Sequence, residues 1–263
     1  MMKTLLTLIF LFLSLGLVVA QTAVQSTSFE KKTFQMGTDQ MPYAILLPDD
    51  YDASKSYPLL LFLHGAGERG ADNESQLTHG AYLFTTKAFR KKFPAIVLMP
   101  QCAVDDYWSN VKKEVPQGGM PNFSFYKKGA PTKAMILLEG LLDEVIQNYS
   151  LDKNRLYVGG LSMGGMGTFE LIKRNPRLFA AAFPICGGAA PKTLRKYKRP
   201  SWWVFHGNAD PVVPASFSTQ MVKKFKKRGF DVRYTLYEGI GHNSWDLAFK
   251  EPGLFPWLFS NTK

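Results

Sequence analysis

The stretch "RLYVGGLSMGGMGTFELIKR", residues 155–174, changes from a strand pattern to a helix pattern at Ser162. The apolar run before the serine is typical of a buried strand, and the residues after it follow helical spacing. Ser162 lies between Gly160 and Gly164, so the segment fits G-x-S-x-G at a strand-to-helix turn. Side chains at those two positions would collide in so tight a turn. Ser162 is therefore a candidate nucleophile, with a hydroxyl in a glycine-rich turn as the alternative interpretation.

Strand and helix patterns alternate along the rest of the chain. Strand-like runs occupy residues 29–37, 41–52, 57–65, 94–101, 154–160, 178–188, 201–210 and 231–239. Helical candidates lie at about 79–92, 131–149, 163–175 and 214–228. This alternation predicts an α/β fold with a mainly parallel sheet of about eight strands and helices on both faces. The first two strands have no helix between them and are expected to pair as a hairpin at one edge.

One long segment lacks a clear period. Residues 102–131 follow the end of a central strand, and long irregular loops in compact domains are usually functional or mobile. We expect this loop to help wall a ligand cleft. The length of the chain fits one large domain, residues 21–263, after a leader.

The N-terminus predicts export. Residues 1–20 contain one basic residue, Lys3, then an apolar core, and end in small residues at the positions that a signal peptidase reads. We interpret them as a cleaved signal peptide, with a retained membrane anchor as the alternative, and expect a secreted or periplasmic protein. No later stretch is apolar enough to span a membrane. Cys102 and Cys186 favour two free thiols, although one disulfide remains open.

The chain is basic, with a formal net charge of +11. Part of that charge lies in "KKFKKRG", residues 223–229, where lysines alternate with Phe225 at helical spacing. This pattern is typical of the solvated face of an amphipathic helix. No nucleic-acid recognition motif accompanies it, so we expect no nucleic-acid partner, whereas attraction to a polyanionic polymer remains open.

A serine nucleophile needs a base, and the base needs an orienting acid. His242 follows the last strand in a glycine-containing loop, and Asp210 follows the strand before it. The order Ser162, Asp210, His242 is that of α/β-hydrolases. His64 and His206 end strands in His-Gly pairs and are expected to brace neighbouring loops. His79 is interpreted as a loop or cap residue that could line the cleft.

An anion hole needs two N–H donors directed at the developing negative charge. Met163 follows the nucleophile and is the first candidate, and Ala66 or Gly67 in "LHGAGERG", residues 63–70, is the second. Glu68 and Arg69 are expected to pair and hold that loop. Gln101, Trp108 and Trp245 are candidates for substrate contact, with buried packing open for both tryptophans. No zinc-type cluster, phosphate loop or dinucleotide fingerprint occurs, so the predicted chemistry requires no metal or cofactor.

Five segments together resemble a known family. "YPLLLFLHGAGERGADN", "IVLMPQC…W", "RLYVGGLSMGGMGTFELIKRNPRLFAAAFPICGG", "VFHGNADPVVP" and "LYEGIGHNSWD" are similar to secreted α/β-hydrolase esterases of the predicted peptidase and phospholipase-carboxylesterase type. These in turn resemble polyhydroxybutyrate depolymerases and feruloyl and acetyl-xylan carbohydrate esterases. The family's nucleophile, acid and base fall on Ser162, Asp210 and His242. The resemblance implies hydrolysis of carboxylic esters, either small molecules or esters of polysaccharide.

Two other functions remain open at this point. A serine peptidase of the prolyl-oligopeptidase type would use the same sheet and triad. A non-catalytic polymer-binding protein with a hydrolase fold would use the basic segments, residues 192–200 and 223–229, but no triad residue type is missing from the sequence.

Overall fold

The computed structural model describes residues 28–263 apart from 118, 120, 127–128, 192–195 and 198. The predicted signal peptide, residues 1–20, lies outside the described residues. The elements of the main sheet are β1 (Glu30–Met36), β2 (Asp39–Leu46), β3 (Tyr57–Leu63), β4 (Ile96–Pro100), β7 (Leu151–Leu161), β8 (Ala181–Ile185), β9 (Ser201–Gly207) and β10 (Val232–Tyr237). The helices are α1 (Ala81–Phe84), α2 (Lys87–Lys92), α3 (Lys133–Asn148), α4 (Met163–Arg174), α5 (Ser216–Lys227), α6 (Trp245–Ala248) and α7 (Leu254–Ser260).

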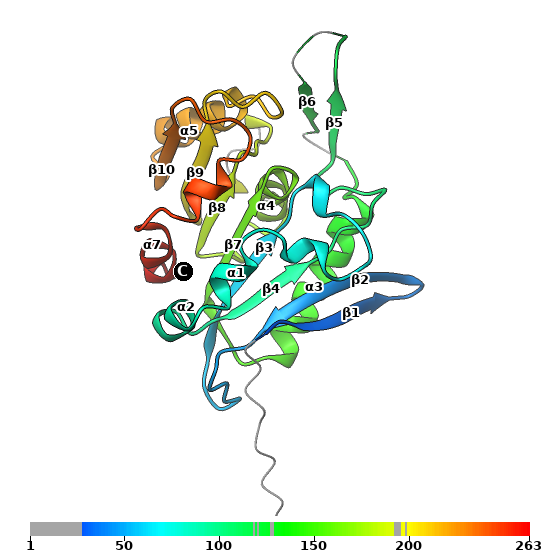
Figure 1. Ribbon diagram of the computed structural model, residues 1–263, viewed down its shortest axis with the longest axis vertical. Helices are drawn as coiled ribbons and strands as arrows, with labels where there is room; N and C mark the ends of the chain where they lie inside the picture. Colours follow the sequence, from blue (N-terminus) through cyan, green and yellow to red (C-terminus); the bar gives the residue numbers. More distant parts are fainter. Residues whose placement is uncertain (1–27, 118, 120, 127–128, 192–195, 198) are drawn as a thin grey trace, which may run out of the picture.

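The sheet has eight strands in the order β1-β2-β4-β3-β7-β8-β9-β10 (Figure 1). From β4 to β10 every neighbouring pair is parallel, whereas β1 pairs with β2, and β2 with β4, in the antiparallel direction. This confirms the predicted fold class and the predicted edge hairpin. The parallel strands all end at one rim of the sheet, so the residues that follow them gather there.

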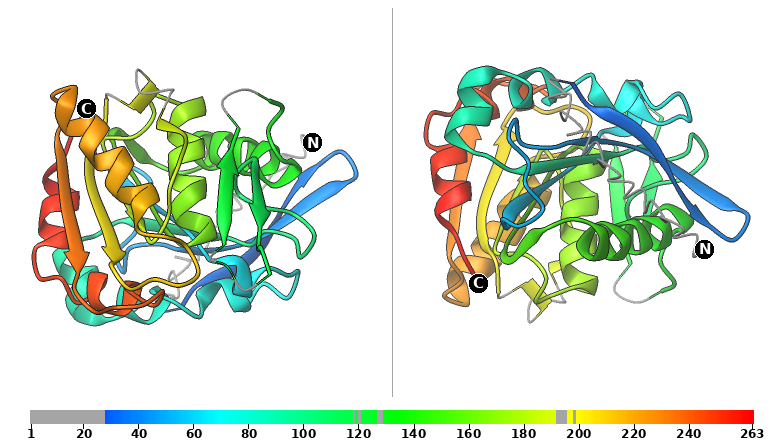
Figure 2. Two further views of the ribbon diagram at one scale, coloured as in Figure 1. Left: turned by 90° about the horizontal axis from the view of Figure 1, so that it is seen from above. Right: turned by 90° about the horizontal axis from the view of Figure 1, so that it is seen from below.

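Two helix layers cover the sheet, and the central strand shows why. All seven residues of β3, "YPLLLFL", are buried, as expected for a strand covered on both faces. Leu59, Leu61 and Leu63 point into the core beneath α3, α4 and α5. Leu60 and Phe62 point to the opposite side, into the core beneath α1, α2, α6 and α7. The two views of Figure 2 show the sheet between these helix groups.

The predicted helix over 79–92 is wrong as one element, because the chain forms two short helices. Helix α1 ends at Phe84, and Thr86 then begins α2 by accepting a hydrogen bond from the N–H of Phe89 with its hydroxyl. A threonine cap of this kind satisfies a free N–H group at a helix start, so it favours a new helix over continuation of the old one.

The predicted irregular segment 102–131 also contains regular structure. Strands β5 (Val111–Glu114) and β6 (Asn122–Phe125) form a separate antiparallel hairpin that projects from the main sheet (Figure 1). Phe123 of β6 packs against Met166 and Val213. The strands are short and three of the four residues in β5 are exposed, so the segment carries little of the hydrophobic periodicity by which strands are predicted.

Two smaller predictions are confirmed. Helix α5 buries Met221, Val222 and Phe225, and the lysines between and after them are exposed, as expected for an amphipathic surface helix. Cys102 and Cys186 are free and buried. Within the described part of the chain, no helix combines the length and apolar character that crossing a membrane requires.

Candidate active site

Ser162 occupies a strained turn between β7 and α4. Its backbone has φ 53° and ψ −114°, a left-handed conformation that is rare for a residue with a side chain. The glycines around it are required by space. A Cβ on Gly160 would lie 2.4 Å from the carbonyl oxygen of Gly164, and one on Gly164 would lie 2.0 Å from that of Leu63. The turn therefore presents the serine at the rim of the sheet, as the G-x-S-x-G pattern predicts.

The structure brings Ser162, His242 and Asp210 together. The Nε2 atom of His242 lies 2.9 Å from the Oγ of Ser162, and its Nδ1 atom lies 2.8 Å from Oδ2 of Asp210. The serine follows β7, the aspartate follows β9 and the histidine follows β10, so three strand ends supply the three groups. Both distances are within hydrogen-bonding range. The arrangement lets the imidazole accept the serine proton while the carboxylate holds the ring.

Asp210 is buried and contacts four nitrogen groups. The backbone N–H groups of Val212 and Val213 donate to Oδ1 at 2.8 and 2.9 Å, while His242 and His206 contact Oδ2. Burial by itself would raise the pKa of Asp210, but the hydrogen bonds from His206, His242 and Val213 outweigh it and hold the pKa well below the usual range. The group stays ionised at neutral pH, as an acid that stabilises an imidazolium must.

The loop after β3 lies against the nucleophile. A Cβ on Gly65 would come within 3.7 Å of the Cβ of Ser162, so the backbone that leads into Ala66 and Gly67 passes beside the serine. Ala66 begins a short 3-10 helix (Ala66–Glu68), and Met163 is the first residue of α4. N–H groups in the first turn of a helix have no partner within that helix. The backbones of all three predicted anion-hole residues thus lie in the two segments that meet at Ser162.

The predicted pair of Glu68 and Arg69 is wrong. Glu68 faces His79 instead, with Oε1 3.6 Å from Nε2, and its Oε2 atom is buried without a hydrogen-bond partner. Arg69 donates to the carbonyl oxygens of Ala66 and Asp106. The loop is therefore fixed by backbone acceptors, which a sequence pattern does not reveal.

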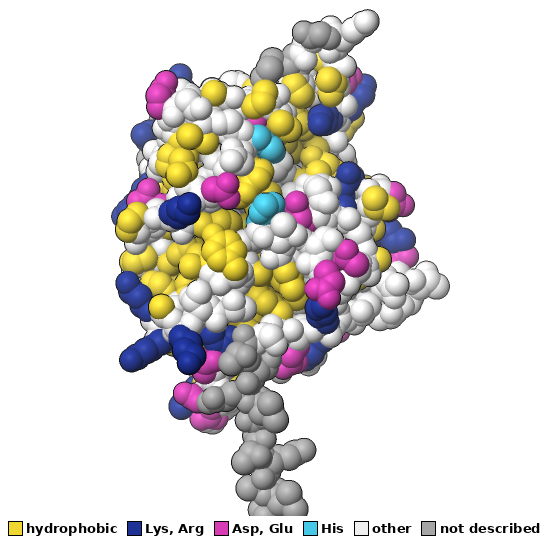
Figure 3. Space-filling view, in the orientation of Figure 1, with side chains coloured by type: hydrophobic (Ala, Val, Ile, Leu, Met, Phe, Trp, Pro, Cys, Tyr) yellow, Lys and Arg dark blue, Asp and Glu magenta, His cyan; other side chains and the backbone are white. Residues whose placement is uncertain are grey.

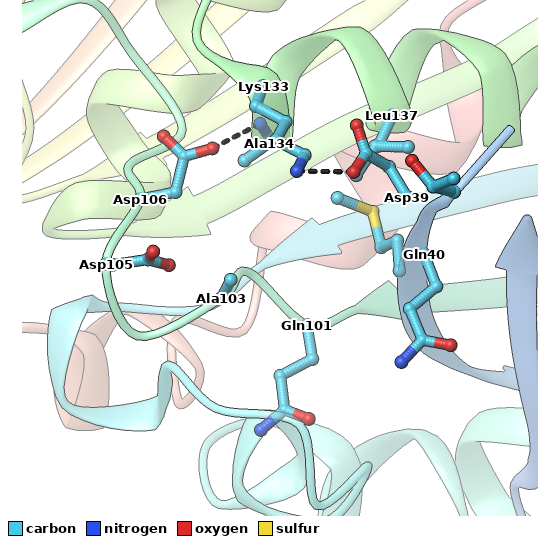
Figure 4. A pocket seen from close by; sticks show the side chains of 11 residues that line it. Asp39, Gln40, Gln101, Ala103, Asp105, Asp106, Lys133, Ala134 and Leu137 are labelled. Atoms are coloured by element: carbon cyan, nitrogen blue, oxygen red, sulfur yellow. Dashed lines mark hydrogen bonds and ion pairs between the residues drawn. The ribbon is translucent and has the colours of Figure 1, made fainter. Parts of the chain in front are cut away.

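Gln101 is buried and serves the same loop rather than an open cleft. Its Oε1 accepts from the N–H of Asn73, and its Nε2 donates to the carbonyl oxygen of Glu68 and to the carboxylate of Asp72. It also borders a separate cavity of about 480 Å³ between the β1–β2 turn, the loop after β4 and the start of α3 (Figure 4). Its expected contact with substrate is corrected to a role in anchoring the loop, because all these bonds hold the side chain inward.

The two candidate tryptophans, Trp108 and Trp245, differ in their exposure to solvent. Trp108 has no exposed surface and donates its indole N–H to the carbonyl oxygen of His64 at 3.1 Å, so it packs beneath the site and the prediction that it contacts substrate is wrong. Trp245 is partly exposed. Its ring centroid lies 5.4 Å from that of His242 and 5.2 Å from that of His79. Figure 3 shows histidine atoms at the surface of this face next to hydrophobic side chains.

His64 and His206 brace neighbouring loops, as predicted. Nε2 of His64 accepts from the N–H of Cys102, and its Nδ1 lies 2.6 Å from the carbonyl oxygen of Gly65. Burial is the main reason that the pKa of His64 falls to about 4. His206 contacts Asp210 itself, which was not predicted. The His-Gly pair at the end of β9 was the available signal, but it does not indicate which partner the ring meets.

One group of potential metal ligands occurs among the described residues. Single donor atoms of Cys186, Asp210 and His242 lie within 4.8 Å of one another. Burial raises the pKa of the Cys186 thiol far above its usual value, so it stays protonated at neutral pH. Asp210 and His242 are already hydrogen-bonded to each other. A metal ion here would have to replace the contact that orients His242, so the two uses of these side chains exclude each other.

Residues 51–251 match the model of the phospholipase/carboxylesterase family. The chain belongs to this family. It therefore has the α/β-hydrolase fold and is a hydrolase of the carboxylesterase type, as the resemblance implied. The match extends from the turn before β3 to the residues after α6 and so includes the candidate nucleophile, acid and base.

Individual relatives match this chain at low to moderate sequence identity. Acyl-protein thioesterase 1 of Debaryomyces hansenii is 24% identical over 70% of this chain and 84% of its own length. A probable feruloyl esterase C of Aspergillus oryzae is 23% identical over 79% of this chain and 70% of its own length. A solved thermostable esterase superposes with a TM-score of 0.81 and 36% identity over 90% of this chain. This chain spans 64% of that esterase's length.

Proposed function

We propose that this chain is an exported serine esterase that hydrolyses carboxylic esters through an acyl-enzyme on Ser162. The observation that carries the proposal is the continuous hydrogen-bonded chain from Ser162 through His242 to the ionised Asp210. Membership of a carboxylesterase family supports it. The apolar leader at residues 1–20 supports export.

The reaction proceeds in two halves. Oγ of Ser162 attacks the ester carbonyl carbon while Nε2 of His242 takes its proton, and the resulting imidazolium is stabilised by Asp210. The imidazolium then protonates the leaving alkoxide, the ester C–O bond breaks, and the acyl group stays on the serine. In the second half His242 takes a proton from water, the hydroxide attacks the acyl-enzyme, and the acid product leaves as Oγ regains its proton.

The negative oxygen of each tetrahedral intermediate is stabilised by backbone N–H groups of Met163 and of Ala66 or Gly67. The N–H of Met163 begins α4, whose positive end favours an anion, and Ala66 and Gly67 begin the short 3-10 helix after β3. Loss of one such donor typically costs about 3 kcal/mol of barrier height.

We propose acyl, acetyl or feruloyl esters of polysaccharide, or small esters, as substrates. The relatives named feruloyl esterase support this class. Trp245 is partly exposed beside the candidate base, so an aromatic or sugar ring bound there would stack on it. We expect Trp245→Ala to raise KM for methyl ferulate more than for the smaller p-nitrophenyl acetate.

The experiment compares purified wild-type protein with Ser162→Ala on p-nitrophenyl acetate and methyl ferulate. A fluorophosphonate probe labels wild type in parallel. Ser54→Ala, which changes an exposed turn serine, is the matched control and should behave as wild type. Equal rates for wild type and Ser162→Ala would refute the mechanism. Cleavage of proline-containing peptides with negligible ester turnover would replace it by a peptidase function.

A further inference from the structure

His206 is a buried histidine whose ring touches the proposed catalytic acid. It lies at the end of β9 with no exposed surface. Its Nδ1 lies 2.8 Å from Oγ of Ser218, which in turn lies 2.8 Å from the carbonyl oxygen of Gly187. Its Nε2 lies 2.9 Å from the carbonyl oxygen of Val213 and 3.2 Å from Oδ2 of Asp210. Every one of these contacts is with oxygen.

The number of hydrogen atoms available in this network determines which nitrogens of the His206 ring carry a proton. If only Nδ1 carried a proton, the lone pair of Nε2 would face the oxygens of Val213 and Asp210. If only Nε2 carried a proton, the single hydroxyl hydrogen of Ser218 would have to serve both Nδ1 and the carbonyl of Gly187. With both nitrogens protonated, Nδ1 donates to Ser218, Ser218 donates to Gly187, and Nε2 donates to Val213 and Asp210. Only this state leaves no buried acceptor facing another.

A buried charge requires a counter-charge. The carboxylate of Asp210 supplies this counter-charge, 3.2 Å from Nε2 of His206. The other hydrogen-bond partners of the ring, Val213 in the loop after β9 and Ser218 in α5, are neutral. From the end of β8, the Cys186 thiol approaches Asp210 but is neutral.

We propose that His206 is a buried imidazolium that shares Oδ2 of Asp210 with His242 and so acts as a positioning residue for the catalytic acid. The proposal rests on the triad assigned under the proposed function. With two backbone donors on Oδ1 and two imidazoles on Oδ2, the carboxylate cannot rotate away from His242. The positive charge of His206 is separated from His242 by one shared carboxylate oxygen, so it also contributes to the electrostatic field at that base.

The first test measures the protonation of the His206 ring directly. Nitrogen-15 NMR of the labelled protein between pH 5.5 and 8.5 reports which imidazole nitrogens carry protons, with His206→Gln used for assignment. We expect both nitrogens of His206 to be protonated throughout. His64 is the internal reference, because its Nε2 accepts from the N–H of Cys102 and must lack a proton. An unprotonated nitrogen on His206 at pH 7 would overturn the proposal, whether or not the protein hydrolyses esters.

The second test measures the pH dependence of kcat/KM for p-nitrophenyl acetate. His206→Gln keeps an N–H donor but removes the charge. In the His206→Gln variant we expect the acid limb of the pH profile of kcat/KM to lie about one pH unit higher than in wild type. We expect kcat on the pH plateau to stay within about tenfold of wild type. His64→Gln is the matched control, since that buried histidine does not touch Asp210, and its acid limb should stay in place. If folded His206→Gln has the same acid limb in its pH profile of kcat/KM as wild type, the electrostatic role of His206 is excluded. If Ser162→Ala keeps its activity, the proposed function itself is refuted.

Discussion

Replacing Asp210 by asparagine tests the orientation of the proposed base. Oδ1 accepts two backbone N–H groups, from Val212 and Val213, so the amide oxygen of an asparagine must occupy that side. The amide NH₂ then replaces Oδ2 and faces Nδ1 of His242. Nδ1 must accept this hydrogen bond, which moves the imidazole proton to Nε2. That nitrogen then faces Ser162 with a hydrogen and cannot take the serine proton.

The expected loss is about 10⁴-fold in kcat, which corresponds to about 5 kcal/mol of barrier height. The assay is p-nitrophenyl acetate hydrolysis at neutral pH, with circular dichroism to confirm that the variant folds. Asp246→Asn is the matched control, because Asp246 is near His242 in sequence but its carboxylate accepts a hydrogen bond from the side chain of Asn243. We expect that control to keep wild-type kcat. A folded Asp210→Asn protein with more than about a tenth of wild-type kcat would refute the tautomer argument.

Three further predictions concern the residues around the nucleophile. Gly164→Ala places a methyl group 2.0 Å from the carbonyl oxygen of Leu63 and should abolish folding or lower Tm sharply, whereas Gly67→Ala meets nothing within 4 Å and should leave Tm nearly unchanged. Because burial lowers the pKa of His64 to about 4 from 6.5, its neutral form stabilises the fold above pH 6.5, and that contribution of up to about 3 kcal/mol is lost as pH falls toward 4. Urea unfolding of wild type and His64→Gln across this range would measure it, and parallel pH profiles would contradict it. Trp108→Phe leaves the buried carbonyl oxygen of His64 without its indole donor and opens a small cavity, so it should cost about 2–4 kcal/mol of stability without changing KM. A several-fold rise in KM at unchanged Tm would instead make it a substrate contact.

Much of the fold and the three candidate catalytic residues were predictable from local sequence patterns. The alternation of strands and helices depends on hydrophobic periodicity, which a sequence shows directly, and it correctly predicted the eight-stranded sheet and the edge hairpin. The positions of Ser162, Asp210 and His242 after three of the parallel strands were also visible, and the ends of parallel strands share one rim. Chain order and turn chemistry were sufficient to name these three residues.

Tertiary packing decided the rest, because partners far apart in sequence leave no local trace. His242 is 80 residues from Ser162 and 32 from Asp210, so their distances exist only in the folded chain. Gln101 and Trp108 follow a central strand, as a substrate contact would, yet packing buries both beneath the active-site loop. The protonation inferred for His206 depends on three oxygens at its ring, from Asp210, Val213 and Ser218, and on the Gly187 carbonyl that Ser218 contacts. No sequence pattern shows that these oxygens meet around one histidine.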